Sequence, residues 1–395
     1  MELAIKQKVD SIAECVFARI QDTQEKSYGL YSGEFGQLLF LLYYSKFSKN
    51  NGHVLLTDNY AEQLMQQFVE REKMHTFCSG FSGILYLFEF LRKNQIINLD
   101  AGNVQPFLDN YIVSKMRWDM RNRHFDFMHC ALGVGLYFLK RKTNPEYIQQ
   151  LIDFLYHTAE KDASNRIFKW ESVVDYEKKL PGYNLALSHG ISSIIIFLSR
   201  VVKSGMYNEK ISETLTGAVN YVISQQKNFS ELGYFFPSFV FKNLPNPASK
   251  SRLAWCYGDL GPGVALWQAG IALKNTEWQE KALEILLQST QRRAFNETFT
   301  SDAGICHGSA GIVMIFRRMF FETKRSEFND AVNYWIKQTL NFSRFEDGLA
   351  GYKTMEKEGW KCDYSLLSGI TGIGLVLLSY LVDDEQDWDE LFLLS

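Results

Sequence analysis

A short glycine-based device recurs seven times in the 395-residue chain and constrains the fold more than any other feature. Each copy has a small residue, usually a second small residue three positions later, and then an apolar run of helical length. The copies begin at residues 33, 80, 130, 190, 258, 308 and 369. All of these are glycine except Cys130. Recurrence at intervals of 47 to 68 residues is typical of a repeat architecture.

The apolar runs are predicted to be buried helices. They are apolar on nearly all sides, as helices packed on two faces should be. Clear examples are residues 37–44, 84–91, 191–198 and 373–381. A buried strand can also be apolar throughout, but continuation into basic ends such as Leu91-Arg92-Lys93 favours helices.

More amphipathic stretches lie between these runs, at residues 144–163, 208–226 and 277–292. Each repeat is therefore predicted to hold one inner and one outer helix. An open stack of repeats needs polar terminal units, whereas here the first and last copies are as apolar as the others. We expect one closed all-α domain over residues 1–395.

The two longest intervals between repeats, around residues 163–186 and 227–255, contain Pro181-Gly182 and the Pro-rich segment 244–249. They are predicted to be long loops on the rim of the inner helices, where a substrate entrance would form.

Composition excludes several classes of function. A net charge of −3 argues against binding to nucleic acid or an anionic membrane. The N-terminal sequence lacks the pattern of a signal peptide, and no apolar run approaches the roughly 18 residues of a spanning helix. Six widely spaced cysteines indicate reduced thiols and a cytoplasmic protein.

Thiol and imidazole groups fall at matching positions of the repeats, directly before the glycine. The neighbouring fifth and sixth copies supply Cys256, Cys306 and His307. Two thiolates and an imidazole form a Zn²⁺ ligand set with an open fourth position, as in catalytic sites. Sulfur ligands argue against Mg²⁺ or Ca²⁺. From these residues alone, two buried free cysteines with a packed histidine are an alternative.

The third and fourth copies supply Asp126 and His189. A carboxylate beside a neutral imidazole is a common acid/base arrangement, although each residue alone is compatible with a structural role. Arg252 is predicted either to bind a substrate anion or to pair with an acidic neighbour. His129 either borders the site or packs, and Cys78 is expected to have no role in it.

Four segments resemble the signature motifs of the lanthionine synthetase C-like family, the lanthipeptide cyclases. They are Arg252–Gly263 (RLAWCYGDLGPG), Ile305–Gly311 (ICHGSAG), Leu187–Gly190 (LSHG) and Phe125–Gly133 (FDFMHCALG). The resemblance covers all seven repeats, and the pairing of Trp-Cys-Tyr-Gly with Cys-His-Gly is highly specific. It implies an α/α toroid, a double-layered barrel of seven inner and seven outer helices, with zinc at one end.

The resemblance also implies roles for individual residues. Cys256, Cys306 and His307 match the zinc ligands of the family. His189 and Asp126 match its acid/base pair, and Arg252 matches an active-site residue. Cys130 departs from the glycine usual at its position, which affects the expected local packing more than the chemistry.

The implied reaction adds a peptide cysteine to dehydroalanine or dehydrobutyrine and forms a lanthionine or methyllanthionine thioether ring. Whether His189 protonates the resulting enolate or deprotonates the thiol is open at this point. The implied partners are a dehydrated precursor peptide, a separate dehydratase and an exporter. The interval between Gly80 and Cys130 leaves no room for the β-rich insertion of some cyclases, so the binding mode of a leader peptide is also open. Since no dehydratase or kinase domain precedes the repeats, a stand-alone cyclase is expected.

Three other functions compete with this interpretation. Addition of glutathione to dehydroamino acids in proteins would use the same metal chemistry on a different substrate. A protein prenyltransferase β-subunit also activates a thiol with zinc in an α/α toroid, but the Gly pairs and Cys-His-Gly disfavour it. A catalytically inactive peptide-binding scaffold is disfavoured because all the key residues of the family are present.

Overall fold

The computed structural model describes residues 1–395 except 23–26, 97–104, 165, 176, 246–250 and 383–386. The chain divides into two compact units. The first contains residues 1–112, 300–393 and 395, and the second contains residues 113–299 and 394. Each unit is described by itself below.

The first unit is built mainly from helices that alternate between buried and half-buried ones. They are α1 (Glu2–Ile20), α2 (Glu34–Ser48), α3 (Asn51–Arg71), α4 (Phe81–Lys93), α14 (Ser309–Thr323), α15 (Ser326–Asn341), α16 (Ile370–Leu381) and the 3₁₀ helix η1 (Asp387–Phe392). The helix α5 (Gln105–Arg121) begins in this unit and ends in the second. Two strands, β6 (Thr354–Glu356) and β7 (Gly359–Lys361), form an antiparallel hairpin.

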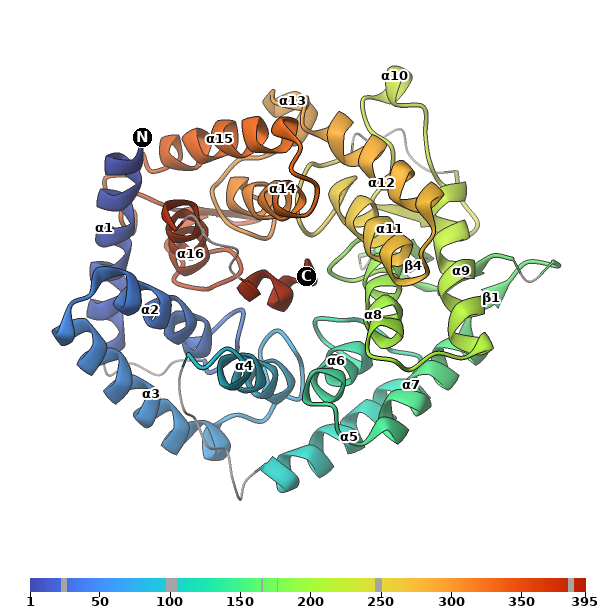
Figure 1. The fold of residues 1–395 in the computed structure, drawn as a ribbon, viewed down its shortest axis with the longest axis horizontal. Coiled ribbons are helices and arrows are strands. Elements are labelled where there is room, and N and C mark those ends of the chain that lie inside the picture. Colours follow the sequence, from blue (N-terminus) through green and yellow to red (C-terminus); the bar gives the residue numbers. More distant parts are fainter. Residues whose placement is uncertain (23–26, 97–104, 165, 176, 246–250, 383–386) are drawn as a thin grey trace. The chain divides into compact units, whose positions relative to one another are not determined.

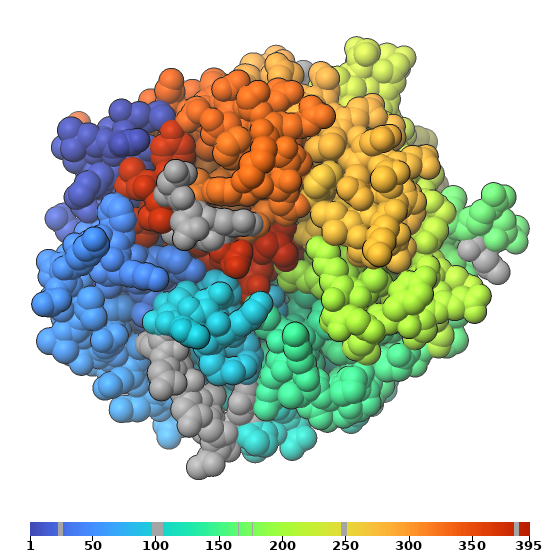
Figure 2. Space-filling model, viewed as in Figure 1, coloured from blue at the N-terminus to red at the C-terminus, as the bar shows by residue number. Residues whose placement is uncertain are grey.

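The two ends of the chain pack together within this first unit. The last inner helix, α16, lies against α1 and α2, and also contacts α14 (Figure 1). On the face seen in Figure 2, the dark-blue N-terminal atoms and the red C-terminal atoms lie side by side. The first helix of the chain is thus the outer partner of the last inner helix.

The second unit repeats the same inner and outer pairing. Its helices are α6 (Ala131–Arg141), α7 (Pro145–Thr158), α8 (Ile191–Lys203), α9 (Glu209–Ser224), α10 (Phe229–Leu232), α11 (Leu260–Ala272), α12 (Thr276–Ser289) and α13 (Phe295–Thr298). The inner helix α8 packs against α6 and α11 on either side and against its outer partner α9. It is buried over almost its whole length, whereas α7 buries one stripe at the spacing of a helix face.

The repeated glycine has a steric cause at the start of each inner helix. A Cβ atom on Gly190 would lie 2.3 Å from the backbone oxygen of Asn184, six residues earlier. A Cβ atom on Gly33, Gly80 or Gly369 would likewise lie 2.3 Å from the backbone oxygen of the residue six positions earlier. The loop before each of these helices therefore folds back so closely on the helix start that only glycine fits.

Short strands replace part of the loops expected in the second unit. They are β1 (Glu160–Lys161), β2 (Phe168–Lys169), β3 (Ser172–Asp175), β4 (Leu180–Asn184) and β5 (Phe239–Phe241). An antiparallel sheet of order β3-β4-β5 joins the two long intervals. The prediction of long loops in these intervals did not include the strands, which are too short to give a recognisable alternation. The Pro-rich segment 244–249 lies mostly outside the described residues.

The described parts of the chain contain no helix that combines the length and the apolarity needed to cross a lipid bilayer.

Candidate active site

His189 and Asp126 are in direct contact in the second unit. His189 precedes α8, and Asp126 lies in the loop between α5 and α6. The Nδ1 atom of His189 is 2.6 Å from Oδ2 of Asp126. The other carboxylate oxygen, Oδ1, accepts a hydrogen bond of 2.8 Å from the backbone N–H of His129. With both oxygens engaged, the carboxylate is held in one orientation toward the imidazole.

The environment of His189 favours its protonated form. Burial by itself would lower the pKa of His189, but its hydrogen bond to Asp126, the charge of Asp126 and the charge of Cys256 together raise the pKa above its ordinary value. Because Asp126 engages Nδ1, the other ring nitrogen, Nε2, is the atom available for proton transfer.

A second imidazole lies against the first. The rings of His129 and His189 are stacked, with centroids 5.5 Å apart and planes 14° from parallel. Burial lowers the pKa of His129, Asp126 opposes this effect, and His189 lowers the pKa further, for a net decrease. The pKa values of the two stacked histidines are thus shifted in opposite directions. The donor atoms of Asp126, His129 and His189 also lie within 4.8 Å of one another, a spacing that a metal ion could bridge.

Cys256 lies on a tight loop next to this pair. The loop begins at Ser251 and ends at Gly258, and Leu253 forms an antiparallel bridge with Gly258. Gly258 has a φ of +94°, and a Cβ there would lie 1.7 Å from the backbone oxygen of Arg252, so a side chain is excluded.

The Cys256 loop is tied to the loop of His189. Cys256 is 4% exposed, and its backbone oxygen accepts a hydrogen bond of 3.3 Å from the hydroxyl of Ser188. The ring of Tyr257 lies 6.4 Å from that of His189. Half-buried Arg252 stands near the start of the same loop. The structure thus brings His189, Asp126 and the Cys256 loop into one neighbourhood.

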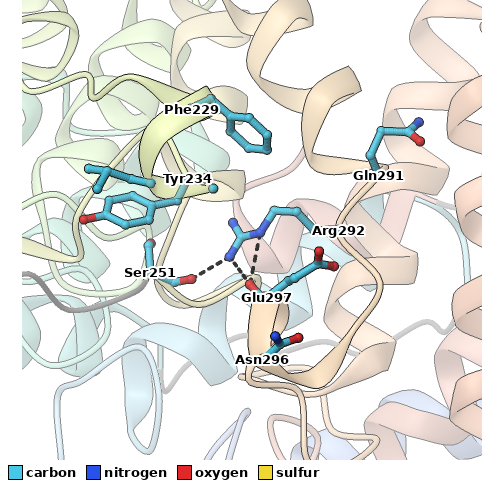
Figure 3. Close-up of a pocket in the computed structure, with 9 residues that line it drawn as sticks. Phe229, Tyr234, Ser251, Gln291, Arg292, Asn296 and Glu297 are labelled. Atoms are coloured by element: carbon cyan, nitrogen blue, oxygen red, sulfur yellow. Dashed lines mark hydrogen bonds between the residues drawn. The ribbon is translucent and has the colours of Figure 1, made fainter.

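A buried ion pair clamps both ends of the Cys256 loop. The Nη1 atom of Arg292 is 2.9 Å from Oδ2 of Asp259, and both side chains are almost fully buried. The other terminal nitrogen of Arg292, Nη2, donates to the backbone oxygen of Ser251 at 2.5 Å. Figure 3 shows this arginine at the edge of a cavity of about 180 Å³, bonded to Ser251 and Glu297. Sequence reasoning missed Arg292, which lies outside every motif.

Cys306 and His307 precede α14 in the first unit. The backbone N–H groups of Ile305 and Cys306 both donate to the oxygen of Leu367, at 3.0 and 2.9 Å. The Nε2 atom of His307 lies 3.2 Å from Oδ2 of Asp302, a carboxylate that is 1% exposed. Sequence reasoning also missed Asp302, although it stands five residues before His307.

The carboxylate of Asp302 is itself fixed. It accepts hydrogen bonds of 3.1 Å from the backbone N–H groups of Gly304 and Met355. A histidine oriented through one ring nitrogen by a buried carboxylate is the usual arrangement of a metal-ligating imidazole. The donors of each unit, taken separately, therefore fit Zn²⁺: a buried thiol in the second, and a thiol with an oriented imidazole in the first.

Comparison with known proteins gives a consistent family match. A family model described as lanthionine synthetase C-like protein matches residues 24–393. The nisin biosynthesis protein NisC of Lactococcus lactis subsp. lactis is 27% identical over 207 residues, which is 50% of this chain and 44% of that protein. The match thus spans less than half the length of that curated relative.

A solved structure of a nisin cyclase is similar over 99% of this chain and 97% of its own, with a TM-score of 0.77 and 20% sequence identity. At this identity the likeness concerns the fold alone. It confirms the predicted fold class, an all-α fold of the α/α toroid type.

Proposed function

We propose, since the chain belongs to the lanthionine synthetase C-like family, that it is a zinc-dependent lanthipeptide cyclase. Its reaction would add cysteine thiols of a dehydrated precursor peptide to dehydroalanine or dehydrobutyrine residues and form thioether rings. The observation that supports this best is the His189–Asp126 pair, held beside the loop that carries Cys256. Such a site offers a proton donor next to a thiol ligand.

Cys256, Cys306 and His307 are the residues that we propose to hold the Zn²⁺. When bound, the ion would keep the substrate thiol as thiolate at neutral pH, where a free thiol of pKa about 8.5 is mostly protonated. On the protein side, the Asp302 carboxylate at Nε2 of His307 leaves Nδ1 as the ligating atom. Ser188 steadies the backbone at Cys256.

His189 is proposed to transfer the proton that completes the addition. The new carbon–sulfur bond forms at the β-carbon of the dehydroamino acid, and the electron pair of its double bond moves to give an enolate. The α-carbon must then gain a proton. Nε2 of His189 can donate it, because Asp126 raises the pKa of His189 and favours the imidazolium. The proton released by the substrate thiol restores the imidazolium in the next cycle.

Arg252 is proposed to stabilise the enolate. A guanidinium group is always charged and presents several donors, so it suits a negative charge that develops on a carbonyl oxygen. Its position near the start of the Cys256 loop, half-buried, supports this role.

We also propose the partners of the chain, its location in the cell and its domain organisation. A separate dehydratase would supply the dehydrated peptide, an exporter would remove the product, and both would meet the chain in the cytoplasm. We further propose that residues 1–395 act as a single domain, for which one cooperative unfolding transition would be the sign.

The test uses the purified chain and a synthetic peptide that contains one dehydroalanine and one cysteine. Ring closure leaves the mass of the peptide unchanged, so the remaining thiol is counted by alkylation and mass spectrometry. We expect the thiol to disappear with the wild type and to persist with His189→Ala. A parallel reaction offers free glutathione to a dehydroalanine peptide without cysteine. Formation of that adduct alone would favour the glutathione transferase function, and no reaction in either assay by the zinc-loaded chain would favour a scaffold.

A further inference from the structure

The third repeat differs from the other six at the residue that begins its inner helix. In those six repeats, a Cβ atom on the glycine would lie 1.7 to 2.4 Å from an atom of the residue six positions earlier. At the same place the third repeat has Cys130, with a complete side chain. The residue six positions earlier is His124. The loop of this repeat must therefore follow a different path, which leaves room for a thiol.

The backbone before His124 shows the altered path. Arg123 has a φ of +60°, in the left-handed region that arginine seldom adopts. Arg123 ends α5 in a left-handed turn: its N–H donates to the backbone oxygen of Met120 at 3.1 Å, and the N–H of His124 donates to that of Asp119 at 2.9 Å. This turn brings His124 back beside the last turns of α5.

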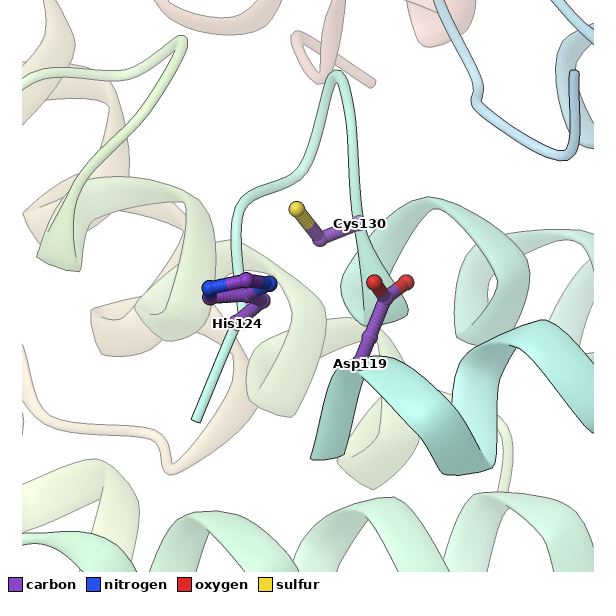
Figure 4. A group of neighbouring side chains, drawn as sticks. All are labelled: Asp119, His124 and Cys130. Atoms are coloured by element: carbon purple, nitrogen blue, oxygen red, sulfur yellow. The ribbon is translucent and has the colours of Figure 1, made fainter. Parts of the chain in front are cut away.

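The altered loop places three ligand-type side chains together. Asp119 comes from the last turns of α5, and His124 and Cys130 come from the loop that follows (Figure 4). One donor atom from each lies within 4.8 Å of the other two. Asp119 is 2% exposed, Cys130 is half-buried and His124 is exposed. The group thus reaches from the interior to the surface.

We propose that Asp119, His124 and Cys130 form a second transition-metal site, with Zn²⁺ as the matching ion. A carboxylate oxygen, an imidazole nitrogen and a thiolate sulfur are all common Zn²⁺ ligands at about 2.0–2.3 Å, whereas sulfur disfavours Mg²⁺ and Ca²⁺. Tetrahedral donors at those distances stand about 3.3–3.8 Å apart. The donor atoms lie no more than 4.8 Å apart, so each pair needs to approach by at most about 1.5 Å. The exposed ring of His124 can move toward the other two donors by rotation.

Charge supports a cation at this position. The thiol of Cys130 lies near two carboxylates, those of Asp119 and Asp126. A divalent ion would balance the Asp119 carboxylate and the Cys130 thiolate together. On the other side, His124 lines a cavity of about 310 Å³ together with Trp170 and Val173.

A metal ion at the proposed site would affect the proposed reaction indirectly, by fixing the position of Asp126. His124 and Cys130 are the two ends of a segment whose third residue is Asp126, and the backbone N–H of Cys130 donates to the oxygen of Asp126 at 3.1 Å. An ion bound at both ends would hold the segment, and with it the carboxylate that orients His189. This consequence rests on the proposed function, whereas metal binding itself does not.

The test removes the first metal centre and asks whether a second remains. Full-length Cys256→Ala is stripped with a chelator and titrated with Zn²⁺, and with Co²⁺ to detect the charge-transfer absorption of a thiolate ligand. We expect about one ion per chain and a thiolate band. Both should vanish in Cys256→Ala/Cys130→Gly, where glycine is the residue that the other six repeats carry. Cys256→Ala/Cys15→Ala, which removes a cysteine of another helix, is the control and should bind as before.

His124→Ala is a second ligand variant, chosen because the substitution of an exposed residue should not cause misfolding. The side chain is exposed and its ring packs only edge-on against that of Trp118, which is half exposed, so its removal should disturb the core little. We expect Zn²⁺ affinity in the Cys256→Ala background to fall by at least tenfold. The proposal is overturned if Cys256→Ala binds no ion, or if binding persists unchanged without Cys130 or His124. Neither result affects the first centre, which Cys130→Gly alone should retain with about one Zn²⁺.

Discussion

Nδ1 of His189 lies 2.6 Å from Oδ2 of Asp126, although 63 positions separate the two residues in the chain. The contact joins the loop before α8 to the loop before α6, two consecutive inner helices that pack on each other. It selects the ring nitrogen that remains available for chemistry and raises the pKa of the imidazole.

Replacing His189 by alanine should slow cyclisation strongly without loss of zinc. General acid catalysis typically contributes 10²–10⁴-fold in rate, and we expect a decrease in that range. Thiol alkylation of the peptide measures the rate, and elemental analysis measures the metal. Loss of zinc from this variant would refute the separation between proton transfer and metal binding.

The pH dependence of the reaction should report His189. Its pKa is raised, so a step that needs the imidazolium runs below that pKa and declines as the pH rises through it. In Asp126→Asn the main raising influence is gone, and the decline should move to lower pH. The proton also contributes stability below the ordinary histidine pKa, and this contribution is lost as the pH rises through the folded value. An unchanged profile of kcat against pH in Asp126→Asn would contradict the assignment.

Cys306→Ala should lower the zinc content by about one equivalent per chain. The loss of one thiolate from a three-residue ligand set leaves too few donors for tight binding. Cys78→Ala is the matched control, because Cys78 occupies the equivalent position of the second repeat and should be without effect. Equal zinc in Cys306→Ala and wild type, measured by inductively coupled plasma mass spectrometry, would remove Cys306 from the ligand set.

Asp302→Asn should weaken zinc binding by about 10–100-fold, the usual effect of removing the carboxylate behind a histidine ligand. Asparagine keeps an oxygen that can accept from the Gly304 N–H, so the loop should remain folded. Competition with a chromophoric chelator measures the affinity. Full affinity in this variant would show that Asp302 does not orient His307 for the metal.

Arg292→Ala should destabilise the fold by about 3–5 kcal/mol, because it leaves the buried carboxylate of Asp259 without its partner. The free energy of unfolding from urea titration measures this loss. Arg293→Ala provides the comparison, because Arg293 is the next residue in the chain and is only half-buried. A loss below about 1 kcal/mol would mean that the clamp on the Cys256 loop is supplied by other contacts.

The repeated glycine and the apolar runs were sufficient to predict the helices. The predicted stretch 208–226 contains α9, which spans Glu209–Ser224, and the run 191–198 lies within α8. These predictions succeed because a helix is encoded locally, in spacing that recurs every few residues. The short strands β3, β4 and β5 were not predictable in the same way, since β5 pairs with residues more than fifty positions earlier in the chain.

The sequence also predicted where the thiols and imidazoles lie, because residues at equivalent positions of the repeats stand at the starts of equivalent helices. Asp126 beside His189 was predicted from the sequence, but other side chains that hold these groups in place were revealed by the tertiary structure alone. Asp302 behind His307, Arg292 at the ends of the Cys256 loop and Asp119 beside Cys130 carry no motif of their own. Their contacts depend on how loops fold back on helix starts. Sequence thus determined the helices and the chemical groups they present, while the close approach of loop to helix determined which of those groups meet.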